Sequence, residues 1–121
     1  MEGKAVTGAR GERIAAEYLR LIGYRIIETN HRIGHLEIDI VAEKDDCLVF
    51  VEVRTKRSRT FGDALSSVDR NKRSRLRRAA GSYLSALEAE RSCRDIRIDV
   101  IGIDISASQG EMSLRHIRGA V

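Results

Sequence analysis

The chain has 121 residues, 42% of them apolar, and no Pro-rich or Ser/Gly-rich linker, which favours one domain spanning residues 1–121. Its formal charge of +4 leans towards a polyanionic partner, while 4% aromatic content without tryptophan argues against a stacking platform for single-stranded nucleic acid. Two distant cysteines, no apolar leader and no membrane-spanning apolar run predict a cytoplasmic protein with no membrane contact.

The first part of the chain predicts a helix and then a short strand. Residues 8–22 carry apolar side chains at three- and four-residue steps, which indicates a helix with one apolar face that ends at Gly23. Glu12 lies on that face, where it either interacts with the helix dipole or belongs to a site. Residues 24–29 have the pattern of a strand, and residues 30–34 that of a connection.

Residues 35–56 predict two antiparallel strands joined by a turn at residues 43–46. Because side chains alternate between the two faces of a strand, Glu37 and Asp39 share one face. Glu52, Arg54 and Lys56 share a face of the second strand in the same way. Charges are costly to bury unless they are paired or bind a metal, so these five residues mark the candidate site.

Basic charge is concentrated after this hairpin. Residues 57–71 predict an ordered loop, either facing a substrate or simply connecting two elements. Asp69 or Ser67 then caps a helix expected over residues 70–90. Its buried face is predicted to contain Leu76, Ala79, Ala80, Tyr83, Leu84 and Leu87.

The opposite face of this helix is strongly basic. Six cations fall within residues 70–78, where they pair poorly with acids and repel one another. A nucleic-acid backbone would relieve that repulsion, although a solvated helix face is the alternative. We expect the nucleic-acid-binding residues to be Arg57, Arg70, Lys72, Arg73 and Arg77.

The last part predicts two more strands. Residues 95–105 alternate as a strand, residues 106–110 form a turn, and residues 112–118 form an edge strand. His31, His35 and His116 are scattered and are expected to be surface or hydrogen-bonding residues. The element order is therefore αβββαββ, a mixed α/β domain with the hairpin at its centre.

The spacing of the hairpin acids suggests a chemistry. Twelve residues separate Asp39 from Glu52-Val53-Arg54, which places carboxylates on adjacent strands. Such oxygen ligands suit a hard cation such as Mg²⁺, whose shell is commonly completed by water and substrate phosphate. A bound metal can activate water and stabilise charge on a phosphate, and a cation at position 54 could assist.

This arrangement resembles the PD-(D/E)xK phosphodiesterase superfamily, the restriction-endonuclease-like fold. Beyond that short motif, the chain resembles the YraN family, bacterial endonuclease-like proteins related in fold to archaeal Holliday-junction resolvases. The resemblance runs from Gly8 to the C terminus and rests on several matches, among them Gly8-Ala-Arg-Gly-Glu12, Asn30-x-Arg32, Glu37-Ile-Asp39, Phe50-Val-Glu-Val53 and His116-Ile117. It implies an αβββαβ core with a mixed central sheet flanked by two helices.

The resemblance also implies roles for residues. Glu12, Asp39 and Glu52 would bind Mg²⁺ or Mn²⁺, and Asp39 and Glu52 would act in catalysis with Arg54 and Lys56. Leu36 departs from the family's usual Gly, and Arg54 departs from its usual Lys. Lys can lose its proton whereas Arg effectively cannot, so Lys56 on the same strand face is the candidate substitute for the usual Lys.

Three functions follow as expectations. The first is a metal-dependent DNA endonuclease that hydrolyses phosphodiester bonds, with branched or junction DNA as a candidate substrate. A resolvase-like role would require two active sites and hence a homodimer. The alternative is a catalytically impaired nucleic-acid-binding protein on the same fold, its site decayed at Arg54. A protein-interaction domain with a solvated basic face would explain the helix but not the acids.

Overall fold

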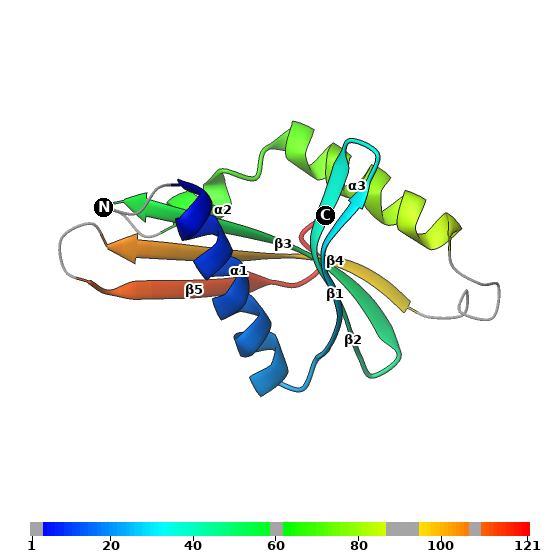
Figure 1. Ribbon diagram of the computed structural model, residues 1–121, viewed down its shortest axis with the longest axis horizontal. Coiled ribbons are helices and arrows are strands. Elements are labelled where there is room, and N and C mark those ends of the chain that lie inside the picture. Colours follow the sequence, from blue (N-terminus) through cyan, green and yellow to red (C-terminus); the bar gives the residue numbers. More distant parts are fainter. Residues whose placement is uncertain (1–3, 59–61, 87–94, 107–109) are drawn as a thin grey trace.

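The computed structural model describes residues 4–58, 62–86, 95–106 and 110–121. Its five strands form one sheet in the order β1-β2-β3-β4-β5, with β3 and β4 parallel and the other neighbours antiparallel. The architecture is α/β, a mixed sheet flanked by helices, consistent with the expected restriction-endonuclease-like core (Figure 1). The elements are α1 (Lys4–Leu21), β1 (Arg25–Ile33), β2 (Leu36–Lys44), β3 (Cys47–Ser58), α2 (Asp63–Ser66), α3 (Arg70–Ser85), β4 (Asp95–Ser106) and β5 (Met112–Ile117).

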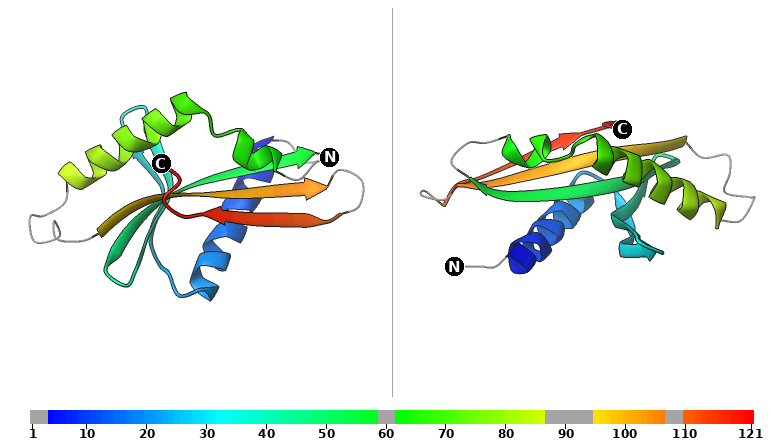
Figure 2. Two further views of the ribbon diagram at one scale, coloured as in Figure 1. Left: turned by 180° about the vertical axis from the view of Figure 1, so that it is seen from behind. Right: turned by 90° about the horizontal axis from the view of Figure 1, so that it is seen from above.

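Helices cover both faces of the sheet. α1 lies on one face, and α2 and α3 lie on the other (Figure 2). Alternate residues of β3 serve the two layers: Val49 and Val51 pack in the core under α1, whereas Phe50 packs against Tyr83 of α3. A strand buried on both faces is apolar at nearly every position, which explains the run from Leu48 to Val53 that only Glu52 interrupts. None of the described helices is long and apolar enough to cross a membrane.

Most predicted elements are confirmed. The central hairpin turns at Asp45 and Asp46, which both have positive φ (51° and 63°), as a tight two-residue turn between twisted strands requires. Asp69 is the cap of α3, since its carboxylate accepts the Lys72 N–H at 2.9 Å. β5 is the predicted edge strand at the end of the sheet. Leu76, Ala79, Ala80 and Tyr83 form the buried face of α3, with Leu84 partly buried.

Three predicted boundaries are wrong. α1 begins at Lys4 rather than at residue 8. The expected connection over residues 30–34 is instead the second half of β1, which continues to Ile33 through a bulge between Ile26 and Glu28 and a left-handed Asn30 (φ 53°). The expected loop over residues 57–71 contains the end of β3 and the helix α2, while residues 59–61 lie outside the described residues. α3 is described to Ser85, so Leu87 and the predicted end at residue 90 lie outside the described residues, as does most of the predicted turn at 106–110.

The sheet forks at its centre. Pairing between β2 and β3 runs from Lys44 and Cys47 only as far as Ile40 and Val51. Beyond that point β2 stays with β1, whereas β3 continues beside β4 to Ser58, so the two halves diverge (Figure 1). The fork lies between α1 and α3 and provides the space for a site.

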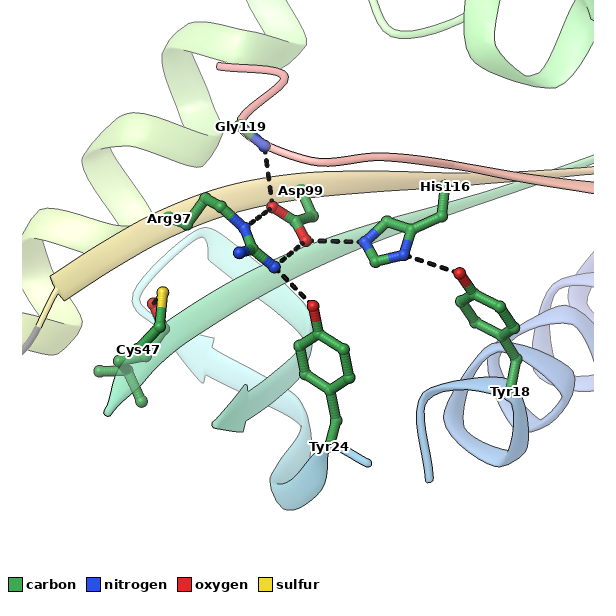
Figure 3. Close-up of polar contacts among 8 residues, drawn as sticks. Tyr18, Tyr24, Cys47, Arg97, Asp99, His116 and Gly119 are labelled. Carbon is green, nitrogen blue, oxygen red and sulfur yellow. Dashed lines mark hydrogen bonds and ion pairs between the residues drawn. The ribbon is translucent and has the colours of Figure 1, made fainter. Parts of the chain in front are cut away.

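A polar network fixes β4 and β5 to the region of α1 (Figure 3). Fully buried Asp99 accepts two bonds from Arg97 (2.7 and 2.9 Å) and one from the Gly119 N–H (3.0 Å), and His116 Nε2 lies 2.7 Å from it. His116 Nδ1 lies 2.9 Å from the Tyr18 hydroxyl. Burial alone would raise the pKa of Asp99, but the bonds from His116, Arg97 and Gly119 outweigh it and lower the pKa to about 2.

Candidate active site

The fork opens into a pocket of about 560 Å³. α1, β2, β3 and α3 all contribute to its lining, so residues distant in sequence meet there. The pocket brings together all the predicted catalytic and metal-binding residues and two of the predicted nucleic-acid-binding residues. Its charged lining consists of Glu12, Asp39, Glu52, Arg54, Lys56, Arg57 and Lys72.

Asp39 is held at the point of divergence. Its Oδ2 accepts the backbone N–H of Val53 at 2.8 Å, just beyond Ile40 and Val51, the last paired residues of β2 and β3. The Asp39 side chain thus accepts a hydrogen bond that a backbone carbonyl would accept if the pairing of the two strands continued. Because Asp39 is only 9% exposed, its carboxylate has a fixed position at the base of the pocket.

Glu12 enters the pocket because α1 approaches β3 closely at Gly11. A Cβ at Gly11 would collide with the Thr55 side chain, so this approach requires glycine. The Glu12 carboxylate bonds with the side chain of Asn30, the left-handed residue of β1. Sequence reasoning noted Asn30 only as a family match, and assigned it no role. Its supporting role depends on the conformation of β1.

Three carboxylates cluster around Asp39: Glu12 lines this pocket with it, and Glu37 lines a smaller neighbouring pocket that also contains Asp39. Oxygens of Glu12, Glu37 and Asp39 all lie within 4.8 Å of one another, so this group could hold a metal ion. The expected metal set was Glu12, Asp39 and Glu52. The structure thus adds Glu37 to the cluster, while Glu52 lies beside it and hydrogen bonds to Asp39.

The acids oppose one another's ionisation. Burial, followed by the hydrogen bond and charge of Glu52, raises the pKa of Asp39 to about 9, although the Val53 N–H opposes this shift. Burial also raises the pKa of Glu12, with smaller contributions from the charges of Glu37 and Glu52. A bound cation would favour the ionised forms of all these groups, so the donor set fits a metal.

Glu52 already has a positively charged neighbour. Its Oε2 lies 3.0 Å from Nζ of Lys72, which extends from the first turn of α3. Glu52 is only 2% exposed, and a buried carboxylate of this kind requires such a partner. Sequence reasoning placed Lys72 with the cations that grip a phosphate backbone, whereas here it contacts the acids of the pocket.

The two cations of β3 differ in their surroundings. Arg54 donates from Nε to Ser67 Oγ at 2.9 Å, which ties its guanidinium to the end of α2. α2 is in turn fixed by Asp104 of β4, whose carboxylate accepts the N–H groups of Gly62 and Ala64, each at 2.9 Å. Lys56 lines the same pocket but is exposed.

The basic face of α3 lies next to the pocket. Arg70, Arg73 and Arg77 are exposed, as predicted for this ridge, and they are not part of the pocket lining. A smaller pocket of about 230 Å³ lies alongside; Asp39 and Lys72 line both pockets, and Arg75 and His35 line the smaller one. The acidic pocket and the basic helix therefore form one continuous surface.

The fold and this surface define a class: an α/β protein with a five-stranded mixed sheet flanked by helices and with an acidic cluster that could hold a metal ion. Residues 11–103 match the Uncharacterised protein family UPF0102, and the chain belongs to this family, the YraN family that its motifs resemble.

Relatives match over nearly the full length. A UPF0102 protein of Beutenbergia cavernae is 39% identical over 119 residues, covering 98% of both chains. One from Moorella thermoacetica is 45% identical over 114 residues, covering 93% of this chain and 92% of the relative. Among solved structures, Pyrococcus furiosus SfsA in complex with Ca²⁺ matches with a TM-score of 0.38 and 16% sequence identity. The match covers 95% of this chain and 64% of that chain, and the similarity is too low to assign any property of that protein to this one.

Proposed function

We propose that the protein is a metal-dependent DNA endonuclease that hydrolyses phosphodiester bonds. The observation that carries this proposal is the convergence of Glu12, Glu37 and Asp39 on one point at the edge of the acidic pocket, beside a basic helix. Acids alone would repel a polyanion, and a basic helix alone would only bind it. Their combination in one surface is suited to binding DNA and reacting with it.

The pocket's donors are all carboxylate oxygens, which suit Mg²⁺ or Mn²⁺. Glu12, Glu37 and Asp39 would hold the ion, with Glu52 close enough to join them. When bound, such a cation supplies an activated water and stabilises charge on the phosphate. The Val53 N–H and the Asn30 amide, by bonding to Asp39 and Glu12, keep two of these carboxylates oriented towards the shared point.

Positive charge from β3 and α3 would position the substrate. Arg54, oriented by Ser67, offers a fixed guanidinium for a phosphate oxygen but cannot serve as a base. Lys56 and Arg57 extend the positive charge along β3, and the exposed ridge of α3 would contact neighbouring phosphates. These contacts carry no sequence information, so the substrate would be chosen by its structure, with branched or junction DNA as the candidate.

A second function is favoured by one observation. Arg54 stands where the family usually has Lys, and it bonds to Ser67. A nucleic-acid-binding protein with an impaired site would have this feature. It would bind DNA with strong salt dependence but without a metal requirement.

The deciding experiment is cleavage of labelled duplex, flap and four-way-junction DNA with Mg²⁺ or Mn²⁺, comparing the natural protein with Asp39→Asn. We expect metal-dependent nicking that Asp39→Asn reduces at least 100-fold, roughly the loss that follows removal of a group stabilising the transition state. DNA binding should survive in the variant because the α3 ridge is unchanged. Binding without cleavage under both metals would contradict the endonuclease and favour the second function, with Arg54→Lys as the next variant.

Two further expectations belong to this proposal. Resolution of a four-way junction needs two pockets, so the protein would act there as a homodimer, which the mass of its junction complex would reveal. The reaction would take place in the cytoplasm, in agreement with the cysteine usage of the chain.

A further inference from the structure

Lys72 occupies an unusual position among the cations of the pocket. Its backbone N–H is fixed by the Asp69 cap at 2.9 Å, which sets the residue in the first turn of α3. From there its amine reaches Glu52 Oε2 at 3.0 Å. Arg54, which the sequence motif would place beside the acids, bonds instead to Ser67 at 2.9 Å. The cation that contacts a pocket acid is therefore Lys72 of α3 and not Arg54 of β3.

The Lys72 side chain is also only partly enclosed. It remains 31% exposed, whereas its partner Glu52 is 2% exposed. Lys72 lines both the acidic pocket and the smaller pocket that contains Arg75. A lysine on a flexible four-carbon stem can therefore leave Glu52 for a phosphate at the pocket mouth without any movement of α3.

We propose that Lys72 is an exchangeable counter-ion of this site. In the unligated protein it neutralises Glu52 and competes with a divalent cation for that carboxylate. When nucleic acid binds, its amine contacts a substrate phosphate. The second role rests on the proposed function, whereas the competition for Glu52 does not. Lys72 thus links occupation of the acidic pocket to the grip on the substrate.

Removal of the charge should have opposite effects on two measurements. Lys72→Met keeps the stem but removes the amine, so Glu52 is released and one positive charge leaves the pocket. Mn²⁺ should then bind roughly tenfold more tightly, as expected for one partly buried charge at contact distance. Cleavage at saturating metal should nevertheless be slower by about tenfold or more, because the phosphate loses a cation. A misfolded variant would lose both properties and cannot imitate this pattern.

The experiment is titration calorimetry with Mn²⁺ on the natural protein, Lys72→Met and the control Arg78→Met. Arg78 is exposed on the same helix and lies outside the acidic pocket, so its variant removes an equal charge without releasing Glu52. We expect tighter Mn²⁺ binding for Lys72→Met alone. The gain should vanish when Glu52→Gln is added, because the carboxylate for which the two cations compete is then gone.

The outcomes separate this inference from the proposed function. Mn²⁺ binding by Lys72→Met that is no tighter than that of Arg78→Met overturns the competition. Cleavage by Lys72→Met at the natural rate overturns the phosphate contact while leaving the endonuclease in place. If the natural protein does not cleave DNA but Lys72→Met still binds Mn²⁺ more tightly, the proposed function fails and the competition for Glu52 is supported.

Discussion

Asp39 and Asp99 are both buried aspartates, yet their pKa values are shifted in opposite directions. Asp99 is surrounded by donors, among them Arg97 and His116, which lower its pKa to about 2. Burial, with the neighbouring carboxylates Glu52 and Glu12 adding to its effect, raises the pKa of Asp39 to about 9. The donors around Asp99 stabilise its ionised form, whereas the surroundings of Asp39 favour its protonated form. A buried carboxylate with a raised pKa in a pocket is a candidate for a binding site.

The two aspartates predict opposite pH dependences of stability in metal-free protein. The pKa of Asp39 is raised from its ordinary value of 3.8 to about 9. Its contribution to the free energy of unfolding is therefore fully present below pH 3.8 and is lost as the pH rises through about 9. The lowered pKa of Asp99 gives a stabilising contribution of about 2 kcal/mol. This contribution is fully present above pH 3.8 and is lost as the pH falls through about 2. Urea unfolding in the presence of a chelator measures the free energy of unfolding as a function of pH. Asp39→Asn should make its fall towards high pH less steep, and Asp99→Asn should do the same for its fall towards low pH. Equal slopes for both variants would contradict these assignments.

At this scale the sequence predicts the acids better than their partners. Asp39 and Glu52 stand out because charges interrupt apolar strands, and strand alternation alone predicts the shared face of Glu52 and Arg54. Asn30 and Lys72 could not be found in this way. Each meets its carboxylate only through the bulged path of β1 or the docking of α3, and neither feature is encoded in local spacing.

α1 presents Glu12 to the pocket only because one turn of the helix lies against β3. Gly11 faces Thr55 at a distance that no larger residue could accept, whereas the neighbouring Gly8 has open space around it. The two glycines of the same helix thus have different roles. Gly11 determines how deep α1 is seated, and with it the position of the Glu12 carboxylate.

Alanine substitution should separate the two glycines. Gly11→Ala would force α1 away from β3, destabilising the protein by about 1–3 kcal/mol and weakening metal binding through Glu12. Gly8→Ala, the matched control, should stabilise it by roughly 0.5–1 kcal/mol through helix propensity. Urea unfolding and Mn²⁺ calorimetry measure the two effects. Adding Thr55→Ala should restore much of the loss in Gly11→Ala, and a double variant no better than the single one would argue against this contact.

Elements defined by local chemistry were predictable, and those defined by distant contacts were not. The central hairpin follows from two acidic turn residues, Asp45 and Asp46, between apolar runs. The second half of β1 has a polar sequence typical of a connection, although the structure continues the strand there and leaves it half-exposed. α2 was missed since its four residues are held by Asp104, which lies some forty positions further along the chain.

The basic charge of the molecule is concentrated on α3. The net charge of +4 conceals a basic α3 on one side of the sheet, while α1 on the other side brings an acid into the pocket. A long polyanion lying along α3 would cross the pocket mouth near Lys72. If α3 is the contact surface for nucleic acid, a bound backbone would therefore lie over the acids.

The salt dependence of DNA affinity tests this arrangement. Replacing Arg73 and Arg77 together by Ala should weaken binding to all sequences alike and reduce the slope of log affinity against log salt by roughly two. Replacing exposed Arg13 and Arg20 of α1 removes the same charge from the opposite face and should leave that slope nearly unchanged. Equal slopes for the two double variants, measured by fluorescence anisotropy, would show that α3 is not the contact surface.

The parallel pairing of β3 with β4 has a consequence for how the chain acquires its shape. Cys47 pairs with Asp95 and Ser58 with Ser106, and α2 and α3 lie between these partners in sequence. The hairpins of β1, β2 and β3 close over short distances, but this pairing must wait for a long loop to close, which slows folding. During synthesis, β3 therefore leaves the ribosome before β4 does, with an apolar edge that has no strand to pair with. The buried charge of Glu52 midway along that edge is well placed to discourage premature association with other chains.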